Sequence, residues 1–444
     1  MLNFLSCCKA YFQNIRKAII LLRSSLLTGL NTDNPKDLAV YLQGAMSPGL
    51  AICPRDVLSI SLWKCDSEKF KDFTLRLFVM TDLCAWKKIE EKDNMVAMLL
   101  PTLLSVLISV GADMNKPDKI TGDTAFLISC SKGNYPCCRA MIEAKAALDT
   151  QNKQGVTALM AACNSGHEQC ARALIEAGAQ METKIASGAT ALILSAQNGH
   201  ELCLCALLEK GAAVDAAKNN GFTSLMVSAQ NGHDHCARAL IQAGADIEKP
   251  DNQGWTPLMS TVAKGHDQCA HALIEAKADL EKQTAKGFSA LMLSAQNGHD
   301  HCARALIEAG AAVDAVENTG QTALMSACLK GRDLCARALI EAGADLDKAN
   351  NKGFVALMHA CQNGHDLCAR ALLEASANIN HVNNAGETSL IHACDKGHDH
   401  CVRTLIEAKA KVDVTDNMDW TALMHSVSRG HDMCVRALIE AGAE

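Results

Sequence analysis

The sequence predicts an all-α solenoid, built from helix-turn-helix units that are joined by β-hairpin-like loops. From residue 122 onward one unit recurs ten times with a constant period of 33, without an insertion or a deletion between units. Each unit carries two short apolar patterns at helical spacing, and neither can bury its apolar face without a neighbouring unit. Aromatic residues make up only 4% of the 444 residues, so Ala, Leu and Cys must supply most of the packing.

Nine of the ten units begin with glycine, and the last begins with aspartate. The starts are Gly122, Gly155, Gly188, Gly221, Gly254, Gly287, Gly320, Gly353, Gly386 and Asp419. Two stretches of the array, 228–245 and 294–311, are identical except that Gln242 in the first corresponds to Glu308 in the second. Duplication of one unit explains this identity, and a period of this length is typical of stacked repeat architectures.

The unit that begins at Gly221 shows how each element is predicted. Thr223 suits a helix N-cap, because its hydroxyl can accept a hydrogen bond from a free backbone N–H. Apolar residues follow at helical spacing, and Gly232 ends this first helix because glycine tolerates a positive φ. A second helix follows with Cys236 among its apolar positions, and Gly244 stops it. The polar stretch 249–254 then predicts a turn or a hairpin.

These units resemble the ankyrin repeat, whose pattern runs Gly-x-Thr-Pro-Leu-His through Gly-His to a final Gly-Ala-Asp. Residues 256–258, 265–266 and 343–345 match this pattern directly, and the resemblance covers residues 122–444 in ten units. Two departures recur. Most units have Met where the family has His, and Cys replaces an aliphatic residue early in the second helix. We expect both to change the packing chemistry without changing the fold.

Three segments precede the ten ankyrin-like repeats of 122–444. Residues 95–121 are predicted to be a degenerate capping repeat, because 103–113 resembles a second helix with its Gly-Ala-Asp stop. Residues 31–94 form an irregular helical region in this interpretation. The stretch 95–112 is uncharged, and its length is the lower limit for a membrane span. Because Pro101 interrupts it, we favour a buried cap over a span.

Residues 1–30 form a basic amphipathic segment, with four basic residues and no acidic residue. Its apolar residues approximate one face of a helix. The pattern is consistent with a cap helix over the first repeats, with an organelle transit peptide or with a membrane-surface helix. We favour the cap helix, and this is the one segment through which membrane contact is considered possible.

The 22 cysteines are predicted to be reduced packing residues. One position of the second helix is Cys in all ten units (Cys137, Cys170, Cys203, Cys236, Cys269, Cys302, Cys335, Cys368, Cys401 and Cys434), and one position of the first helix is Cys in five (Cys130, Cys163, Cys328, Cys361 and Cys394). Stacked helices lie ~8–10 Å apart. Equivalent cysteines therefore cannot converge on zinc at ~2.3 Å or reach the Cα separation of under ~7 Å that a disulfide needs. We expect no metal and no cofactor.

Two histidine series recur. The first follows a helix-ending glycine, as at His233 and His299, and the resemblance implies that it hydrogen-bonds to neighbouring backbone; Arg332 replaces it in one unit. The second series, His359, His392 and His425, occupies the last three units. These residues either lie near the repeat interface for packing, which we favour, or respond to pH through shared charge.

Arg and Glu recur four residues apart on the second helix, as in Arg304/Glu308 and Arg337/Glu341. Such a spacing predicts surface ion pairs worth ~0.2–0.5 kcal/mol each. We assign them to solubility.

The sequence predicts that the protein is not an enzyme and has no catalytic residues. It contains no Gly-Lys dipeptide for a phosphate loop, no His-Glu-x-x-His, no Gly-x-Ser-x-Gly and no Cys-x-x-Cys. The resemblance implies instead a protein–protein interaction scaffold, which binds a partner on the concave face made by the hairpins and the first helices. The alternative is a structural subunit of an organelle- or membrane-associated assembly, directed by residues 1–30.

Candidate partner-binding residues lie at two positions of the unit. The residue after the opening glycine is aromatic in five units: Phe222, Trp255, Phe288, Phe354 and Trp420. These rings either contact a partner or pack on the adjacent hairpin and join repeats. The pairs before the Gly-His dipeptide include Gln197, Asn198, Gln230, Asn231, Gln296 and Asn297. They either bond a peptide backbone or are unchanged copies left by duplication.

We expect an unidentified protein partner and no obligate oligomer. Nucleic acid is not expected, because the net charge is −7 and no basic stripe occurs beyond residues 1–30. An intracellular and most simply cytoplasmic location is expected, since there is no convincing secretory signal and no Asn-x-Ser/Thr sequon. Organelle targeting by residues 1–30 is the alternative.

Overall fold

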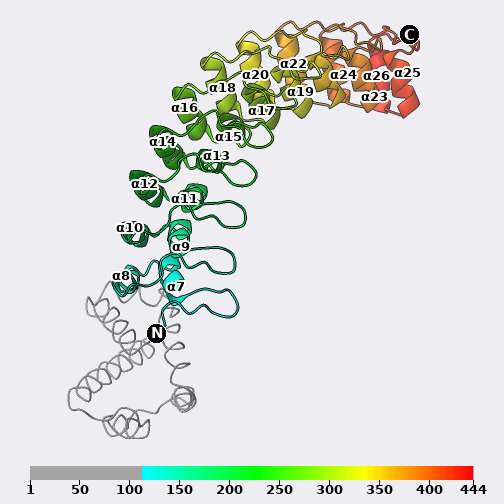
Figure 1. Cartoon of the computed structure of the whole chain (residues 1–444). Coiled ribbons are helices and arrows are strands. Elements are labelled where there is room, and N and C mark those ends of the chain that lie inside the picture. The colour runs from blue at the N-terminus through cyan, green and yellow to red at the C-terminus, as the bar shows by residue number, and fades with distance from the viewer. Residues whose placement is uncertain (1–112, 444) are drawn as a thin grey trace, which may run out of the picture. The chain divides into compact units, whose positions relative to one another are not determined.

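The computed structural model describes residues 113–443, which form helices α7 to α26 in pairs (Figure 1). The bounds are α7 Ala125–Ser131, α8 Tyr135–Glu143, α9 Ala158–Ser165, α10 Glu168–Glu176, α11 Ala191–Asn198, α12 Glu201–Glu209, α13 Ser224–Gln230, α14 Asp234–Gln242, α15 Pro257–Val262, α16 Asp267–Glu275, α17 Ala290–Asn297, α18 Asp300–Glu308, α19 Ala323–Lys330, α20 Asp333–Glu341, α21 Ala356–Gln362, α22 Asp366–Glu374, α23 Ser389–Lys396, α24 Asp399–Glu407, α25 Ala422–Arg429 and α26 Asp432–Glu440. The all-α, repeated architecture is confirmed. Predictions about residues 1–30, 31–94 and 95–112 lie outside the described residues.

The described residues belong to two compact units, the first ending with 169–180 and the second made of 163–168 and 181–443. In the first, α7 packs against α8. In the second, each first helix packs on the first helix of the next repeat, from α11 to α25, and each second helix does the same from α12 to α26. The connecting loops of this unit lie beside the first helices, and the second helices lie on the opposite side (Figure 1).

The first helices begin where a hydroxyl caps them. Thr223 has an extended backbone, and its hydroxyl accepts a hydrogen bond from the N–H of Met226, as the sequence predicted. Val355 occupies the same position before α21 and provides no side-chain cap. The repeats therefore share this hydroxyl cap, and the unit that contains Val355 lacks it.

The connecting loops are tight turns, and no extended strand is formed within residues 113–443. In one loop the N–H of Asp251 donates to the carbonyl of Trp255 at 2.9 Å, and the N–H of Gly254 donates to that of Asp251 at 3.1 Å. Isolated antiparallel bridges join Ala217 to Thr223 and Thr415 to Thr421. The loops are thus hairpin-like, as predicted, with backbone pairing limited to a few residues.

Glycine and histidine of successive repeats fit together between the helices. Gly265 has φ of +76°, and a Cβ at this position would lie 2.4 Å from Nδ1 of His299 in the next repeat. The other ring nitrogen of His299, Nε2, donates to the carbonyl of Ala263 at 3.2 Å. Arg332, which replaces this histidine in one unit, donates from Nε to the carbonyl of Gln296 at 3.4 Å. The backbone hydrogen bond that the resemblance implied is confirmed.

A second set of contacts joins the loops of successive repeats. A carboxylate or amide oxygen accepts a backbone N–H from the loop of the next repeat, as in Asp215 with Asp246 at 3.0 Å and Glu281 with Ala312 at 2.8 Å. The same bond is made by Asp149, Glu182, Glu248, Asp314, Asp347 and Asn380. These bonds satisfy loop donors that no helix or sheet uses.

The cysteines of the described residues pack as small apolar side chains. All of them are free thiols, and all except Cys205 are buried. Burial raises the pKa of the Cys269 thiol to about 12 and that of Cys335 likewise to about 12. These thiols are therefore neutral at physiological pH.

The predicted pairing of Arg with Glu four residues later is wrong at the two pairs given above. Nη1 of Arg304 lies 2.9 Å from Oε2 of Glu341, and Nη1 of Arg337 lies 3.5 Å from Oε2 of Glu374. Each glutamate belongs to the next repeat. The long arginine side chain spans the distance between neighbouring second helices, a route that the spacing within one helix does not reveal.

Candidate partner-binding face

The residue after each opening glycine is held in place by its own loop. The N–H of Trp255 donates to Oδ1 of Asp251 at 2.8 Å, and that of Phe354 donates to Oδ1 of Asn350 at 3.0 Å. The same arrangement fixes Phe288 through Thr284 and Trp420 through Asp416. The N–H of Phe222 instead donates to Oδ1 of Asn220, two residues before it. A side chain from the loop therefore orients the backbone of all five predicted aromatic residues.

The five aromatic side chains retain part of their surface. Phe222, Trp255, Phe288 and Phe354 are half-buried, and Trp420 is 40% exposed. They lie where the loops meet the first helices. An aromatic ring with one covered face and one free face can add contact area to a partner at little entropic cost.

Two of the five rings pack on histidines of the first helices. The Phe354 ring lies 5.2 Å from that of His359 and 4.9 Å from that of His392 in the next repeat. The Trp420 ring lies 5.2 Å from that of His425. Phe354 thus joins two repeats, which was the alternative role considered for these rings.

The asparagines of the predicted Gln–Asn pairs already bind backbone carbonyls. Nδ2 of Asn231 donates to the carbonyl of Gln197 in the preceding repeat at 3.0 Å. Nδ2 of Asn297 donates to the carbonyl of Leu293 at 2.9 Å. Asn198 donates to carbonyls of Leu194 and Asn164 at 3.0 and 3.3 Å. These amides complete helix ends.

The glutamine directly precedes the asparagine in each of these pairs. Gln197 accepts a hydrogen bond at Oε1 from Nζ of Lys218 at 2.6 Å. Burial lowers the pKa of this lysine. Gln230 and Gln296 are half-buried next to exposed asparagines.

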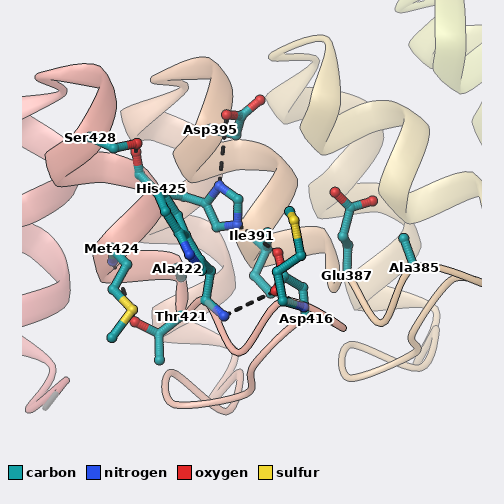
Figure 2. Close-up of polar contacts among 12 residues, drawn as sticks. Ala385, Glu387, Ile391, Asp395, Asp416, Thr421, Ala422, Met424, His425 and Ser428 are labelled. Carbon is teal, nitrogen blue, oxygen red and sulfur yellow. Dashed lines mark hydrogen bonds and ion pairs between the residues drawn. The ribbon is translucent and has the colours of Figure 1, made fainter.

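The histidines of the last repeats form a buried polar row. Figure 2 shows the His425 ring between two carboxylates: its Nε2 lies 2.9 Å from Oδ2 of Asp416, and its Nδ1 lies 3.8 Å from Oδ1 of Asp395. In the preceding repeat, Nε2 of His392 lies 3.4 Å from Oε2 of Glu387. Burial lowers the pKa of His392, although Glu387 and Asp395 oppose that shift.

His359 stands apart within this row. Its side chain is 6% exposed, and neither ring nitrogen has a hydrogen-bond partner. Burial, with the nearby His392, lowers its pKa to about 4. His359 is therefore neutral at physiological pH, and the packing role favoured from the sequence fits its surroundings.

The last repeat presents an apolar hollow that the sequence reading did not single out. An open cavity of 580 Å³ is lined by Trp420, Leu423, Met424, Val427 and Ser428. Met424 is 49% exposed and Val427 60% exposed, although the equivalent Met358 and Cys361 are fully buried under the next repeat. Comparison of equivalent positions along the array would have drawn attention to Val427, where most units have Ala or Cys.

Residues 113–443 contain no group of three or more His, Cys, Asp or Glu side chains that is arranged to hold a metal ion. Over the same residues, no helix has the length and apolar character that a bilayer span requires.

A sequence model of the family "Ankyrin repeats (3 copies)" matches residues 95–185, 180–251, 247–317, 309–383 and 357–444. The chain belongs to the ankyrin-repeat family. Ankyrin repeats are generally protein–protein interaction modules, and proteins of this family are typically non-catalytic. The chain has the helix pairs and loops of that family.

Solved ankyrin-repeat structures resemble parts of the chain. An ankyrin repeat domain from Acinetobacter baumannii is 32% identical, with a TM-score of 0.40, and the match covers 42% of this chain and 98% of that one. The human ASB11 ankyrin repeat domain is 26% identical, with a TM-score of 0.46, and the match covers 50% of this chain and 98% of that one. A search of curated proteins gave no match.

Proposed function

We propose that this ankyrin-repeat protein is a non-catalytic scaffold that binds a partner protein on the face formed by the loops and first helices of 181–443. The observation that supports this is the row of aromatic residues at one position of the repeat. Three of them, Phe222, Trp255 and Phe288, occupy consecutive repeats. Their backbones are fixed by loop side chains, and their rings are half-buried.

The spacing of this row defines what a partner must offer. Neighbouring helices pack at ~8–10 Å, so successive rings are separated by a similar step. A partner helix rises ~10.5 Å in seven residues, and an extended segment rises ~10 Å in three. A partner with an apolar residue at either interval can contact all three rings. Gln230 and Gln296 lie beside the row and can bond a partner's polar groups.

Affinity capture from a cell lysate, followed by mass spectrometry, identifies the partner. Full-length protein with Trp255→Ala and Phe288→Ala should then retain at least tenfold less of it than the unmodified chain. Phe354→Ala is the matched control, because its ring packs on His359 and His392. Undiminished capture by the double variant would remove the aromatic row as the binding site.

A second candidate function rests on the basic composition of residues 1–30. In that proposal the segment directs the protein to an organelle or a membrane, where the repeats dock into an assembly as a structural subunit. In the first proposal, the partner-binding scaffold, the protein remains in the cytoplasm. Imaging of the full-length protein beside a form that lacks residues 1–30 distinguishes them: if both forms remain in the cytosol, the second candidate fails.

A further inference from the structure

The segments that carry the aromatic row have an excess of positive charge in the central repeats. Four consecutive segments, 218–231, 251–264, 284–297 and 317–330, each run from the loop tip through the first helix. Each contains one lysine, and the four are Lys218, Lys264, Lys286 and Lys330. On the opposite side, the second helices α14, α16, α18 and α20 carry seven carboxylates and three arginines. The two sides of these repeats therefore differ in charge.

The only acids in the four segments are Asp251 and Glu317, and both are buried and engaged in their own loops. Oδ1 of Asp251 accepts the N–H groups of Gln253 and Trp255, each at 2.8 Å. Oε1 of Glu317 accepts the N–H of Gln321 at 3.0 Å. A partner on this face therefore meets the lysines more directly than these two carboxylates.

The four lysines have few contacts within the protein. Lys264, Lys286 and Lys330 are exposed, and no carboxylate of residues 113–443 forms an ion pair with them. Lys218 is half-buried, and its Nζ donates to Oε1 of Gln197 at 2.6 Å. Burial lowers the pKa of Lys218, and the amide oxygen that it contacts carries no formal charge. Because an ammonium group has three N–H donors, Lys218 can also donate to a carboxylate of a partner.

A structural role explains only two of the four lysines. Lys264 and Lys330 lie at the C-terminal ends of α15 and α19, where a cation interacts favourably with the helix dipole. Lys218 and Lys286 lie in loops, shortly before Phe222 and Phe288 in the sequence. The two loop lysines thus place positive charge next to the aromatic row without serving a helix end.

The spacing of the charges favours a protein partner over a nucleic acid. Neighbouring repeats are ~8–10 Å apart, so the face offers about one lysine for every 10 Å of its length. A DNA duplex carries a negative charge every ~1.7 Å, and each of its strands every ~3.4 Å. A protein segment with a carboxylate about every three residues when extended, or every seven when helical, matches the lysines far better.

We propose that the partner of the aromatic row is an acidic protein segment, whose Asp or Glu side chains contact the four lysines while its apolar side chains contact Phe222, Trp255 and Phe288. Lys218 and Lys286 bind carboxylates beside the rings, and Lys264 and Lys330 bind them at the ends of the first helices. This inference rests on the proposed function, because it gives the chemistry of the partner for the same face.

The test uses a displayed library of random peptides as the probe. Peptides of about 16 residues span the three rings either as a helix or as an extended strand. Immobilised full-length protein selects binders, and sequencing gives their composition. We expect Asp and Glu to be enriched about twofold or more over the unselected library, with apolar residues three or seven positions apart. Selected peptides without this enrichment, or tighter binding of a single-stranded oligonucleotide than of any selected peptide, would overturn the proposal.

Charge reversal of the loop lysines then locates the contact. Lys218→Glu combined with Lys286→Glu should weaken the binding of a selected acidic peptide by about tenfold, as measured by fluorescence anisotropy. Arg304→Glu combined with Arg337→Glu is the matched control, because it makes the same change of charge on the second helices. The control should change the affinity by less than about twofold. Equal weakening by both pairs would contradict the assigned contact.

The chain with Trp255→Ala and Phe288→Ala separates this inference from the proposed function. If selected peptides are not acidic but lose binding to this variant, the inference fails and the aromatic row stands. If acidic peptides bind this variant undiminished and bind the Lys218/Lys286 variant weakly, the aromatic row fails and the acidic partner stands.

Discussion

The central repeats and the last three repeats have the same backbone arrangement. They differ in the side chains that they bury beneath the row of aromatic residues. At the seventh position of the unit, the central repeats have Val227, Ser260 and Leu293, and the last three have histidine. In the last three the rings of Phe354 and Trp420 pack on those histidines. The aromatic position therefore serves two roles along one array: it joins repeats near the C-terminal end, and we propose that it contacts a partner in the centre.

The duplicated units of the two regions differ at a position that leaves their shared contacts intact. The caps, the glycine that receives the next histidine and the loop carboxylates recur in both regions. The seventh position lies inside the interface, yet it accepts Val, Ser, Leu or His. The buried histidines of the last repeats therefore occur in addition to the contacts that all these repeats share.

The largest expected difference between the two regions is in their response to acid. His359 has a pKa of about 4 in the folded protein against 6.5 for an unperturbed histidine. The unfolded chain therefore binds the proton more readily, and stability falls as the pH drops from about 6.5 towards 4. The loss reaches roughly 3 kcal/mol. Peptide-resolved hydrogen exchange should show it in α21 and α23, and not in α15 or α17.

His359→Leu is the control for that prediction, because Leu293 occupies the same position in the central region. The variant should lose this part of the pH dependence. If acid destabilises α21 equally in the variant and in the unmodified chain, His359 is not the titrating group.

The next largest loss of stability is expected at the glycine that contacts the histidine of the next repeat. Gly265→Ala places a Cβ against the His299 ring and forces a positive φ on alanine. We expect a loss of roughly 2–3 kcal/mol from strain and displacement together. Gly244→Ala is the matched control, since its φ is +83° but no atom lies within 4 Å of the added Cβ. It should cost only about 1 kcal/mol, and urea unfolding measures both.

The equivalent glycine of the last repeats should respond in the same way. Gly364 contacts His398 as Gly265 contacts His299. Gly364→Ala should therefore destabilise the protein by about as much. A clearly smaller cost there would show that the two regions do not share one frame.

Capping gives an intermediate effect of opposite sign. Val355 leaves α21 without the hydroxyl cap that Thr322 and Thr388 give to its neighbours. Val355→Thr should stabilise the C-terminal region by up to about 1 kcal/mol. Thr223→Val should destabilise the central region by a similar amount. Hydrogen exchange of α21 and α13 measures the two changes, and equal signs would contradict this explanation.

The smallest effect concerns the surface ion pairs. Arg304 is 44% exposed and Glu341 is 62% exposed, so their coupling should be about 0.2–1 kcal/mol and should weaken in salt. A double-mutant cycle with alanine at both positions measures it. The same cycle between Arg304 and Glu308 should give less. A larger coupling to Glu308 would restore the pairing that the sequence suggested.

The sequence predicted the features that depend on residues within one repeat. Thr223 as a cap and Gly232 with a positive φ follow from local chemistry, and both are confirmed. The bond of His233 to neighbouring backbone was implied by the resemblance to ankyrin repeats, and the structure shows it at 3.0 Å to Gln197. The period, together with the two apolar patterns at helical spacing in each unit, predicted a stacked all-α fold.

Contacts between different positions of two repeats could not be read in this way. Arg304 reaches Glu341, and the Cys302 thiol donates to Asp267, in a neighbouring repeat but at another position of the unit. Neither interval equals the period of the array, so comparison of equivalent positions does not reveal them. The packing of Phe354 on two histidines likewise depends on ring orientation. The partner-binding residues remain predictions.

Hydrogen exchange of the full-length protein with and without its captured partner tests the central claim most directly. We predict slower exchange on partner binding in the loops and helix starts at 217–226, 249–259 and 283–292, with no change in α14, α16 or α18. Protection confined to these second helices would contradict the proposal that the loop and first-helix face binds the partner.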